Sequence, residues 1–478
     1  MIWLQSGCFT PNPNRAEETA PDTTAAETDT GSTTEPTTDA QEDSGVAPSS
    51  SDTGSSADTD PGTSGVGPID CDNSETSNDC EAPSPYCDGS TCQPCDNLGG
   101  DDFCDGRSSG MVCHPSGGSC EACIENDDCG GGSCGDSYNC VACDEHTDCA
   151  GTACNLETGE CLSTSLVFWI DGTGCGPPGP PDTDPGFGSE NQPYCWLTTA
   201  LDQVESGQSA VFRVSGGPGT QPEVDLSTAP DRTLAFLGLD GWTLGETGSP
   251  FSAGNGSTVF LDSVTVRGAS VAALTCNNAR LWLSNSTIED SASGIVTDTC
   301  SALTVERSQI QQTAGHAIDA RGSDVTIVSS MLVRNGETGT DQSALRLEDS
   351  TFEVRYSTIV GSLGAVARAS LYCLGSGGGL VRNSIVLSPS GPSIDCPVAH
   401  VTGTVADVAP NSGRGNTIVS DYNLGWFQDL TAYDAHVTAG SPFEGAATWG
   451  DGDPRSDFDS ERRLGYAGFP EFAGADQP

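Results

Sequence analysis

Apolar and polar residues follow a repeating pattern through the second half of the chain. Six segments follow, with small departures, the order apolar-x-apolar-x-x-Ser-x-apolar, and successive segments begin 22 or 27 residues apart. Alternation of this kind predicts short β-strands. A period near 22 residues with two or three strands per unit is typical of a parallel β-helix, in which each unit forms one turn of a coil. The segments span residues 259–266, 281–288, 303–310, 325–332, 352–359 and 379–386.

Alignment of these segments produces two columns of equivalent residues. The apolar column is expected to point inward and fill the core, because turns stacked about 4.8 Å apart bring equivalent side chains into contact. The serine column is expected at a corner or inside the coil, where hydroxyl groups bond the backbone, and no G-x-S-x-G motif marks these serines as nucleophiles. The apolar column comprises Leu261, Leu283, Val305, Ile327, Val354 and Val381, and the serine column comprises Ser286, Ser308, Ser330, Ser357 and Ser384.

The chain on either side of the repeats predicts elements that close the coil. Five apolar residues between Trp196 and Val204 recur at helical spacing, which predicts a short amphipathic helix over the open end of the coil and its strand edge. The residues that follow the repeats predict a C-terminal cap. We therefore expect an all-β domain, a parallel β-helix, over residues 162–478.

Residues 71–161 form a separate, cysteine-rich region. They hold 16 cysteines in four groups of four, and a two-residue spacer joins each group to the next. We favour two disulfides in each group, because cross-links replace a core where apolar residues are few. Zinc is the alternative, because the three C-x2-C pairs have the spacing of zinc ligands, although the chain has only five histidines.

The first 70 residues predict an anchor followed by a stalk. The sequence Leu4-Gln5-Ser6-Gly7-Cys8 resembles the tail of a bacterial lipobox, although Leu4 lies one position farther from the cysteine than is usual. Lipidation of Cys8 leaves 22 cysteines, an even number that can pair. Residues 1–8 are too short for a signal-peptide core, so we expect the rest of the signal before Met1. Residues 9–70, rich in Ser, Thr, Pro and acids, predict a disordered linker.

The charge of the chain narrows the classes of partner. The sequence has 68 acidic and 17 basic residues, a net charge of -51, and every basic residue is arginine. This acidity argues against nucleic acid and anionic membrane surfaces, because both require a basic surface on the protein. No apolar run approaches the length of a transmembrane helix. The 23 cysteines in spaced clusters indicate an oxidising compartment.

Motifs at both ends of the predicted coil resemble those of a known family. The opening reads VFWIDG and NQPYCWLTTAL, and the ending reads GSPFEGA, DGDPR and FPEFAGAD. They resemble the corresponding parts of secreted bacterial right-handed β-helix proteins of the pectate-lyase-like superfamily, over about residues 165–478. The cysteine groups resemble arrays in surface proteins of predatory soil bacteria of the myxobacterial type. The resemblance implies a right-handed coil. It does not imply a particular activity, because that superfamily includes lyases, hydrolases and non-catalytic surface proteins.

Six cysteines remain in the coil domain. Their order in the sequence suggests three disulfides, Cys175–Cys195, Cys276–Cys300 and Cys373–Cys396. In the aligned units, Cys276 and Cys300 lie about one turn apart, so we expect this bond to join adjacent turns.

The candidate catalytic residues lie in or beside one turn. The resemblance implies that a lyase of this fold uses acidic calcium ligands and a Lys or Arg base on an outer face. The residues that come nearest to such an arrangement are His316, Asp319 and Arg321, with Asp324 close by in the sequence. An Asp–Arg pair can act as base and charge stabiliser. The alternative is an ordinary salt bridge between neighbouring turns.

An acidic run near the C-terminus is the candidate metal site. Asp451, Asp453, Asp457 and Asp459 could supply oxygen ligands to calcium. The run lies in the terminal motif, so a structural role is the alternative, and no other cofactor is expected.

Two functions remain open at this point. The first is a non-catalytic protein, lipid-anchored rather than membrane-spanning, at the bacterial outer-membrane surface or in the extracellular space. It would bind a polysaccharide or another cell-surface ligand through the coil. The second is a secreted polysaccharide lyase or glycoside hydrolase with a divergent site. Activity on uronic-acid polymers would separate them.

Overall fold

The computed structural model describes most of the chain from residue 141 onward. The gaps are residues 174–186, 216–223, 227–229, 240, 246–249, 337–341, 362–367, 376, 408–409, 411–412, 421, 451 and 464–466, and a few positions between 86 and 140 are also described. The chain divides into two units, 1–66 and 67–478, and all described residues belong to the second. The predicted lipidation site Cys8 and all but the last few residues of the predicted linker lie in the first unit, and the whole of residues 1–70 is outside the described residues.

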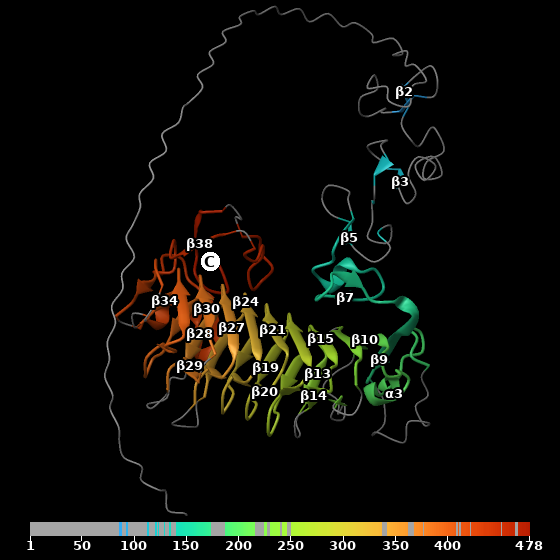
Figure 1. The fold of residues 1–478 in the computed structure, drawn as a ribbon, viewed down its shortest axis with the longest axis horizontal. Helices are drawn as coiled ribbons and strands as arrows, with labels where there is room; N and C mark the ends of the chain where they lie inside the picture. Colours follow the sequence, from blue (N-terminus) through green and yellow to red (C-terminus); the bar gives the residue numbers. More distant parts are fainter. Residues whose placement is uncertain are drawn as a thin grey trace, which may run out of the picture. The chain divides into compact units, whose positions relative to one another are not determined.

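Strands dominate the described part of the chain, and three parallel sheets form the coil (Figure 1). One turn contributes one strand to each sheet, as in β18, β19 and β20. The ten-stranded sheet contains β9 (Val167–Asp171), β10 (Ser209–Ser215), β12 (Thr233–Gly238), β15 (Thr258–Asp262), β18 (Arg280–Ser284), β21 (Ala302–Glu306), β24 (Asp324–Val328), β27 (Thr351–Arg355), β30 (Gly379–Arg382) and β33 (Ala399–Thr402).

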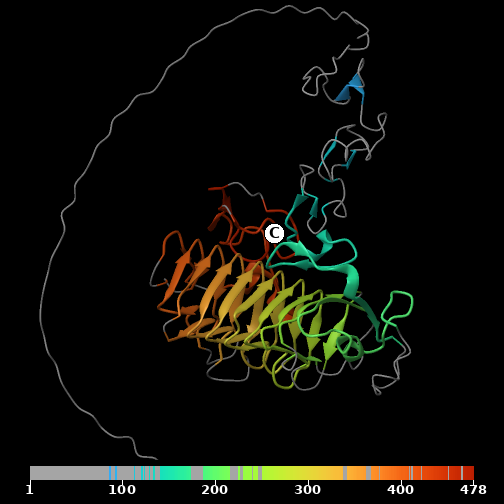
Figure 2. The same ribbon diagram turned by 45° about the vertical axis from the view of Figure 1, so that its right-hand side comes forward.

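The other two sheets run alongside it, and strands that follow one another in the stack lie side by side in chain order (Figure 2). The eight-stranded sheet contains β11 (Val224–Asp225), β14 (Phe251–Gly254), β17 (Leu274–Asn277), β20 (Ile295–Asp298), β23 (Ile318–Arg321), β26 (Leu345–Glu348), β29 (Leu371–Leu374) and β32 (Ile394–Asp395). The nine-stranded sheet contains β13 (Thr243–Gly245), β16 (Thr265–Arg267), β19 (Thr287–Glu289), β22 (Gln309–Gln311), β25 (Met331–Asn335), β28 (Thr358–Gly361), β31 (Ile385–Leu387), β34 (Val405–Ala406) and β35 (Thr417–Ile418).

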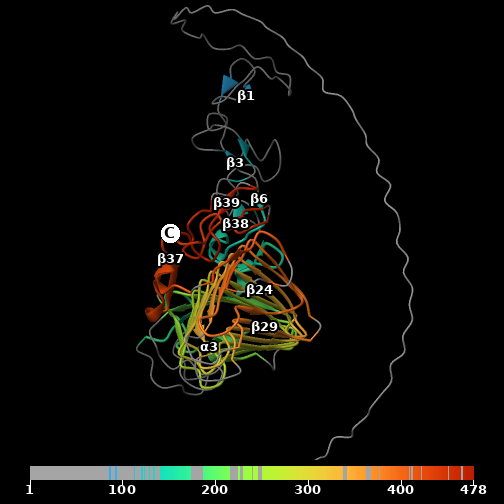
Figure 3. The same cartoon turned by 90° about the vertical axis from the view of Figure 1, so that its left-hand side faces the viewer.

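The core of the coil is the predicted apolar column. Register in the ten-stranded sheet places Leu261 beside Leu283, and the column continues through the stack without a slip. All six residues of the column are fully buried in one apolar cluster. Figure 3 shows the three sheets of the coil from its end. The side chains of the cluster are contributed by the strands of all three sheets. The prediction of an all-β parallel coil is confirmed.

The predicted serine column is buried and forms a continuous hydrogen-bond ladder. The Ser308 N–H donates to Ser330 Oγ one turn farther along, at 3.2 Å, and the same bond joins each neighbouring pair of serines in the column. Each hydroxyl donates in turn to the carbonyl two residues earlier, which belongs to the last residue of the preceding strand. The ladder therefore satisfies backbone groups at the corner between the ten-stranded and nine-stranded sheets, which is a structural role.

Replacement of one ladder serine tests this role. In Ser330→Ala the buried Ser308 N–H loses its acceptor, so we expect a loss of about 1–3 kcal/mol in the free energy of unfolding. Denaturant unfolding measures the loss. Ser301→Ala is the control, because Ser301 is exposed and its hydroxyl only donates to the Ala279 carbonyl. Equal stability of the two variants would contradict the ladder.

A short helix packs at the first turn of the coil, as predicted. Helix α3 spans Leu197–Leu201. Its residues Leu197 and Ala200 are fully buried in the core cluster together with Ile170 of β9. The regular helix ends before Val204, but the side chain of Val204 still joins the core.

The C-terminal segment, for which the sequence predicts a cap, lies along one side of the coil. It packs against the outer side of the nine-stranded sheet, where Met331 and Ile385 point away from the coil and contact residues such as Phe443. Alternate residues of the same strands, such as Leu332, face the core. The segment contains the 3-10 turns η5 (Leu424–Trp426) and η6 (Leu430–Ala432) and the strands β36 (Phe427–Asp429), β37 (Asp434–Val437), β38 (Ala447–Thr448) and β39 (Pro470–Glu471).

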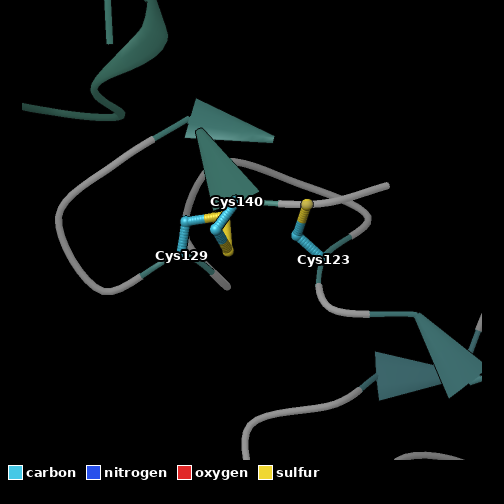
Figure 4. A group of neighbouring side chains, drawn as sticks. All are labelled: Cys123, Cys129 and Cys140. Carbon is cyan, nitrogen blue, oxygen red and sulfur yellow. A yellow bond between two sulfur atoms is a disulfide. The ribbon is translucent and has the colours of Figure 1, made fainter. Parts of the chain in front are cut away.

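The cysteine groups form small hairpins cross-linked by disulfides. In the third and fourth groups the first cysteine bonds the third and the second bonds the fourth, as in Cys123–Cys134 and Cys129–Cys140. Figure 4 shows the Cys129–Cys140 bond beside Cys123. The disulfide interpretation is confirmed for these two groups. The hairpin strands are β1 (Tyr86–Cys87), β2 (Cys92–Gln93), β3 (Val112–Cys113), β4 (Cys120–Glu121), β5 (Ser133–Cys134), β6 (Cys140–Val141), β7 (Cys154–Asn155) and β8 (Glu160–Cys161).

The fourth cysteine group packs directly on the coil. Ala153 and Leu162 join an apolar cluster with Phe260, which points outward from the ten-stranded sheet. Two ion pairs flank the cluster, Arg280 with Glu157 at 2.5 Å and Arg307 with Glu145 at 2.6 Å. The fourth group is therefore packed as part of the coil domain, across the expected division at residues 161 and 162.

Candidate functional site

The outer face of the eight-stranded sheet carries the predicted catalytic residues. Register places Asp319 of β23 directly beside Arg346 of β26, and Arg321 beside Glu348. The intervening residues, such as Ala320 and Leu347, are buried in the core. Because successive side chains of a strand point to opposite faces, these four charged residues share the outer face.

The four residues form a closed network of ion pairs. Arg346 Nη1 lies 2.8 Å from Asp319 Oδ1, and Arg346 Nη2 lies 2.8 Å from Glu348 Oε2. Arg321 lies 3.5 Å from both carboxylates. The side chains of Asp319 and Arg346 are 13% and 19% exposed, whereas that of Arg321 is 54% exposed. The face thus presents the accessible guanidinium group of Arg321 beside the largely buried pair of Asp319 and Arg346.

His316 is close in the chain but has a partner of its own. Its Nδ1 lies 3.0 Å from the backbone nitrogen and oxygen of Ser343. Burial lowers the pKa of His316, because the charged ring would lose its hydration. Burial therefore favours the neutral form of the ring. Asp324 lies elsewhere, on the ten-stranded sheet, where it accepts a hydrogen bond from Thr351 Oγ1.

Three residues of this face were missed by the sequence analysis. Arg346, Glu348 and Tyr372 lie one or two turns beyond Asp319 in the stack. The guanidinium of Arg368 lies 4.6 Å from the centre of the Tyr372 ring, within the range of a cation–π contact. The repeat interval was the available signal, because Arg346 follows Asp319 by 27 residues.

The polar groups of the face are largely engaged with one another. Asp319 accepts hydrogen bonds from both arginines, so the oxygens that a general base would use are already engaged. The remaining groups are guanidinium donors, carboxylate acceptors and a half-buried phenol ring. Such groups bind hydroxyl-rich ligands through hydrogen bonds and stacking.

The acidic run near the C-terminus is divided among separate partners. The carboxylate of Asp453 is fully buried and pairs with Arg382, and it also accepts a hydrogen bond from the Gly450 N–H at 2.7 Å. Asp457 is also buried, which raises its pKa, and its Oδ1 accepts from the Glu461 N–H. Asp459 lies beside His436. The fourth candidate, Asp451, is outside the described residues.

Two of the three disulfides expected in the coil domain are present between described residues. Cys276 of β17 bonds Cys300, which follows β20 of the next turn, and Cys373 bonds Cys396. Cys195 is disulfide-bonded, whereas Cys175 is outside the described residues. The disulfides place the folded protein in an oxidising compartment. In the part of the chain that the structure describes, no helix is long and apolar enough to cross a membrane.

One family model that matches the chain names the same architecture. Residues 247–395 match a family model described as the right-handed beta helix region, and residues 57–167 match a family of unknown function (DUF8331). No curated protein matches the chain. Among solved structures, the chain is similar to the crystal structure of pectate lyase Pel9A, at 14% identity and a TM-score of 0.39 over 66% of this chain and 96% of that one. Because its three parallel sheets are stacked turn on turn and its central turns match this family model, the coil domain of this protein is a right-handed parallel β-helix.

Proposed function

We propose that this protein is a non-catalytic surface protein that binds a neutral polysaccharide through the outer face of its eight-stranded sheet. The observation that carries the proposal is the ion-pair network of Asp319, Arg321, Arg346 and Glu348 beside Tyr372. It supplies fixed donors and acceptors on a regular sheet, where equivalent positions recur one turn apart along the stack. A long polymer can contact side chains at several of these evenly spaced positions.

Charge favours a neutral polymer over an acidic one. The network joins two carboxylates to two guanidinium groups, so it has no net charge. The whole chain carries -51, which repels a polyanion at long range. A neutral glycan avoids this repulsion and still offers hydroxyl groups to the arginines and carboxylates.

The remaining parts of the chain fit presentation at a cell surface. The disulfides require an oxidising compartment. In the proposal, Cys8 carries a lipid anchor and residues 9–70 hold the folded domains away from the membrane. The cysteine groups then act as a cross-linked spacer between this linker and the coil.

Binding to a panel of polysaccharides tests the proposal. Affinity electrophoresis would compare neutral glucans, mannans and xylans with polymers of uronic acids. We expect retardation by at least one neutral polymer, and an affinity reduced about tenfold by Arg321→Ala or Tyr372→Ala, which corresponds to the loss of one well-placed contact. Arg267→Ala is the matched control, because Arg267 forms a similar surface network with Glu289 and Asp290 on the nine-stranded sheet.

The same panel separates binding from catalysis. Incubation with uronic-acid polymers, with and without calcium, would reveal a lyase through the ultraviolet absorbance of unsaturated products. Product formation that disappears in Arg321→Ala would overturn the non-catalytic proposal in favour of a polysaccharide lyase. Retardation by no polymer would overturn the assignment of this face as a glycan site.

A further inference from the structure

Side chains of the types that bind metal ions cluster in the C-terminal segment, away from the outer face of the eight-stranded sheet. His436 of β37, Asp459 and Asp476 each direct one ligand atom into the same space, and these atoms all lie within 4.8 Å of one another. The three residues come from separate stretches of the segment. Asp476 is only 4% exposed, whereas the side chain of Asp459 is half exposed.

The histidine of this cluster is held in the orientation of a metal ligand. Its Nδ1 lies 2.5 Å from Asp434 Oδ1, and the edge of its ring contacts Phe458. A carboxylate that accepts the N–H of one ring nitrogen fixes the tautomer and leaves a lone pair on the other nitrogen. Asp434 therefore prepares His436 Nε2 to act as a ligand.

The contact between His436 and Asp459 lacks a hydrogen bond. The Nε2 atom is shielded from solvent and lies 3.2 Å from Asp459 Oδ2, yet it makes no hydrogen bond to any described group. A lone pair that faces a carboxylate is unfavourable unless a positive charge lies between them. Nearby, Asp457 is fully buried and its Oδ2 also has no hydrogen-bond partner among the described residues. Arg463 is a buried cation that interacts with Asp457 and Asp476. Because Asp434, Asp459 and Asp476 also surround His436, carboxylates still outnumber cations here, and a bound cation would offset the difference.

We propose that His436 Nε2, Asp459 and Asp476 bind one divalent transition-metal ion of the zinc type. Imidazole and carboxylate ligands suit zinc, and tetrahedral bonds of about 2.1 Å place the ligand atoms about 3.4 Å apart, close to the 3.2 Å between His436 and Asp459. Calcium fits less well, because it prefers six to eight oxygen ligands. The ion would join β37, the loop around Asp459 and the last residues of the chain, so its role is to hold the terminal segment together.

The experiment uses the full, disulfide-bonded chain after treatment with a chelator. Zinc and cobalt are titrated separately in physiological salt with excess magnesium, which suppresses non-specific binding to the acidic surface. We expect one equivalent of zinc to bind, one equivalent of cobalt to give visible absorption bands, and the thermal midpoint to rise with either ion. Removal of the orienting carboxylate in Asp434→Asn is expected to weaken affinity 10–100-fold.

Two variants and a control decide the outcome. Asp459→Asn and His436→Gln are each expected to abolish the cobalt bands and the thermal shift. Because Asp459 is half exposed, its substitution leaves the segment folded. Asp298→Asn is the control, because it removes one negative charge, as Asp459→Asn does, from an exposed side chain outside the cluster. It should bind cobalt as the parent protein does. Unchanged cobalt binding in Asp459→Asn would overturn the site. A parent chain without cobalt bands would show that a proton, and no metal, fills the contact.

Discussion

Replacement of Phe260 by alanine is expected to destabilise the protein by about 3–5 kcal/mol, although this side chain points away from the coil interior. Phe260 is fully buried between the ten-stranded sheet and the fourth cysteine group, with Trp282 beside it and His146 in a T-shaped ring contact with it. Its removal leaves a cavity under the cysteine group. Denaturant unfolding would measure the loss, and limited proteolysis would test whether the cysteine group separates from the coil.

Thr326→Ala supplies the control for this substitution. Thr326 belongs to the same outward column three turns farther along, and its side chain is only half-buried. We expect its replacement to change stability by less than about 0.5 kcal/mol. If Phe260→Ala were as stable as Thr326→Ala, the fourth cysteine group would not pack on the coil as the structure shows.

Replacement of Arg382 by methionine is expected to cost about 3–5 kcal/mol, because it leaves a buried carboxylate without its counter-charge. That carboxylate belongs to Asp453, whose side chain is completely buried and also accepts neutral hydrogen bonds from Tyr356 Oη at 3.2 Å, Asn383 Nδ2 at 3.4 Å and the Gly450 N–H. The pair attaches the terminal segment to β30. Thermal and denaturant unfolding of the full chain would measure the effect.

The double variant Arg382→Met with Asp453→Asn separates the charge from the packing. With both charges removed, no buried ion remains, so most of the lost stability should return. Arg267→Met provides the comparison for an exposed pair and should cost less than about 1 kcal/mol. A double variant no more stable than Arg382→Met would show that the alkyl chain of Arg382, and not its charge, stabilises the contact.

The candidate glycan site was only partly predictable. Asp319 and Arg321 lie two residues apart on one strand, so alternation alone places them on one face. Their partners lie one turn away, where the repeat interval changes from 22 to 27 residues. The sequence does not show where in the turn the extra residues are inserted. The partner of Asp319 was therefore ambiguous until the register of β23 and β26 assigned it to Arg346.

Of the proposed metal site, only Asp459 was a candidate ligand in the sequence, as part of the acidic run. His436, Asp459 and Asp476 are separated by 23 and 17 residues, and no ligand spacing or repeat relates them. They meet because the terminal segment folds back on itself beside the nine-stranded sheet. The acidic run that the sequence suggests as a calcium site does not form one cluster, because Asp453 pairs with Arg382 and Asp459 lies beside His436.

The sequence by itself determined the coil, its inward apolar column and its serine ladder, because every turn places the same kinds of residue in the same local environments. Inward residues must be apolar and corner residues must satisfy the backbone, so the pattern recurs at each turn. Only the tertiary structure decided what covers the outside. Phe260 and Met331 find their partners more than 90 residues away along the chain, and alternation cannot show which outward face another segment will cover. The packed cysteine group and the proposed metal site follow from that second layer of contacts, whereas the charged face of the eight-stranded sheet follows from the register between neighbouring turns.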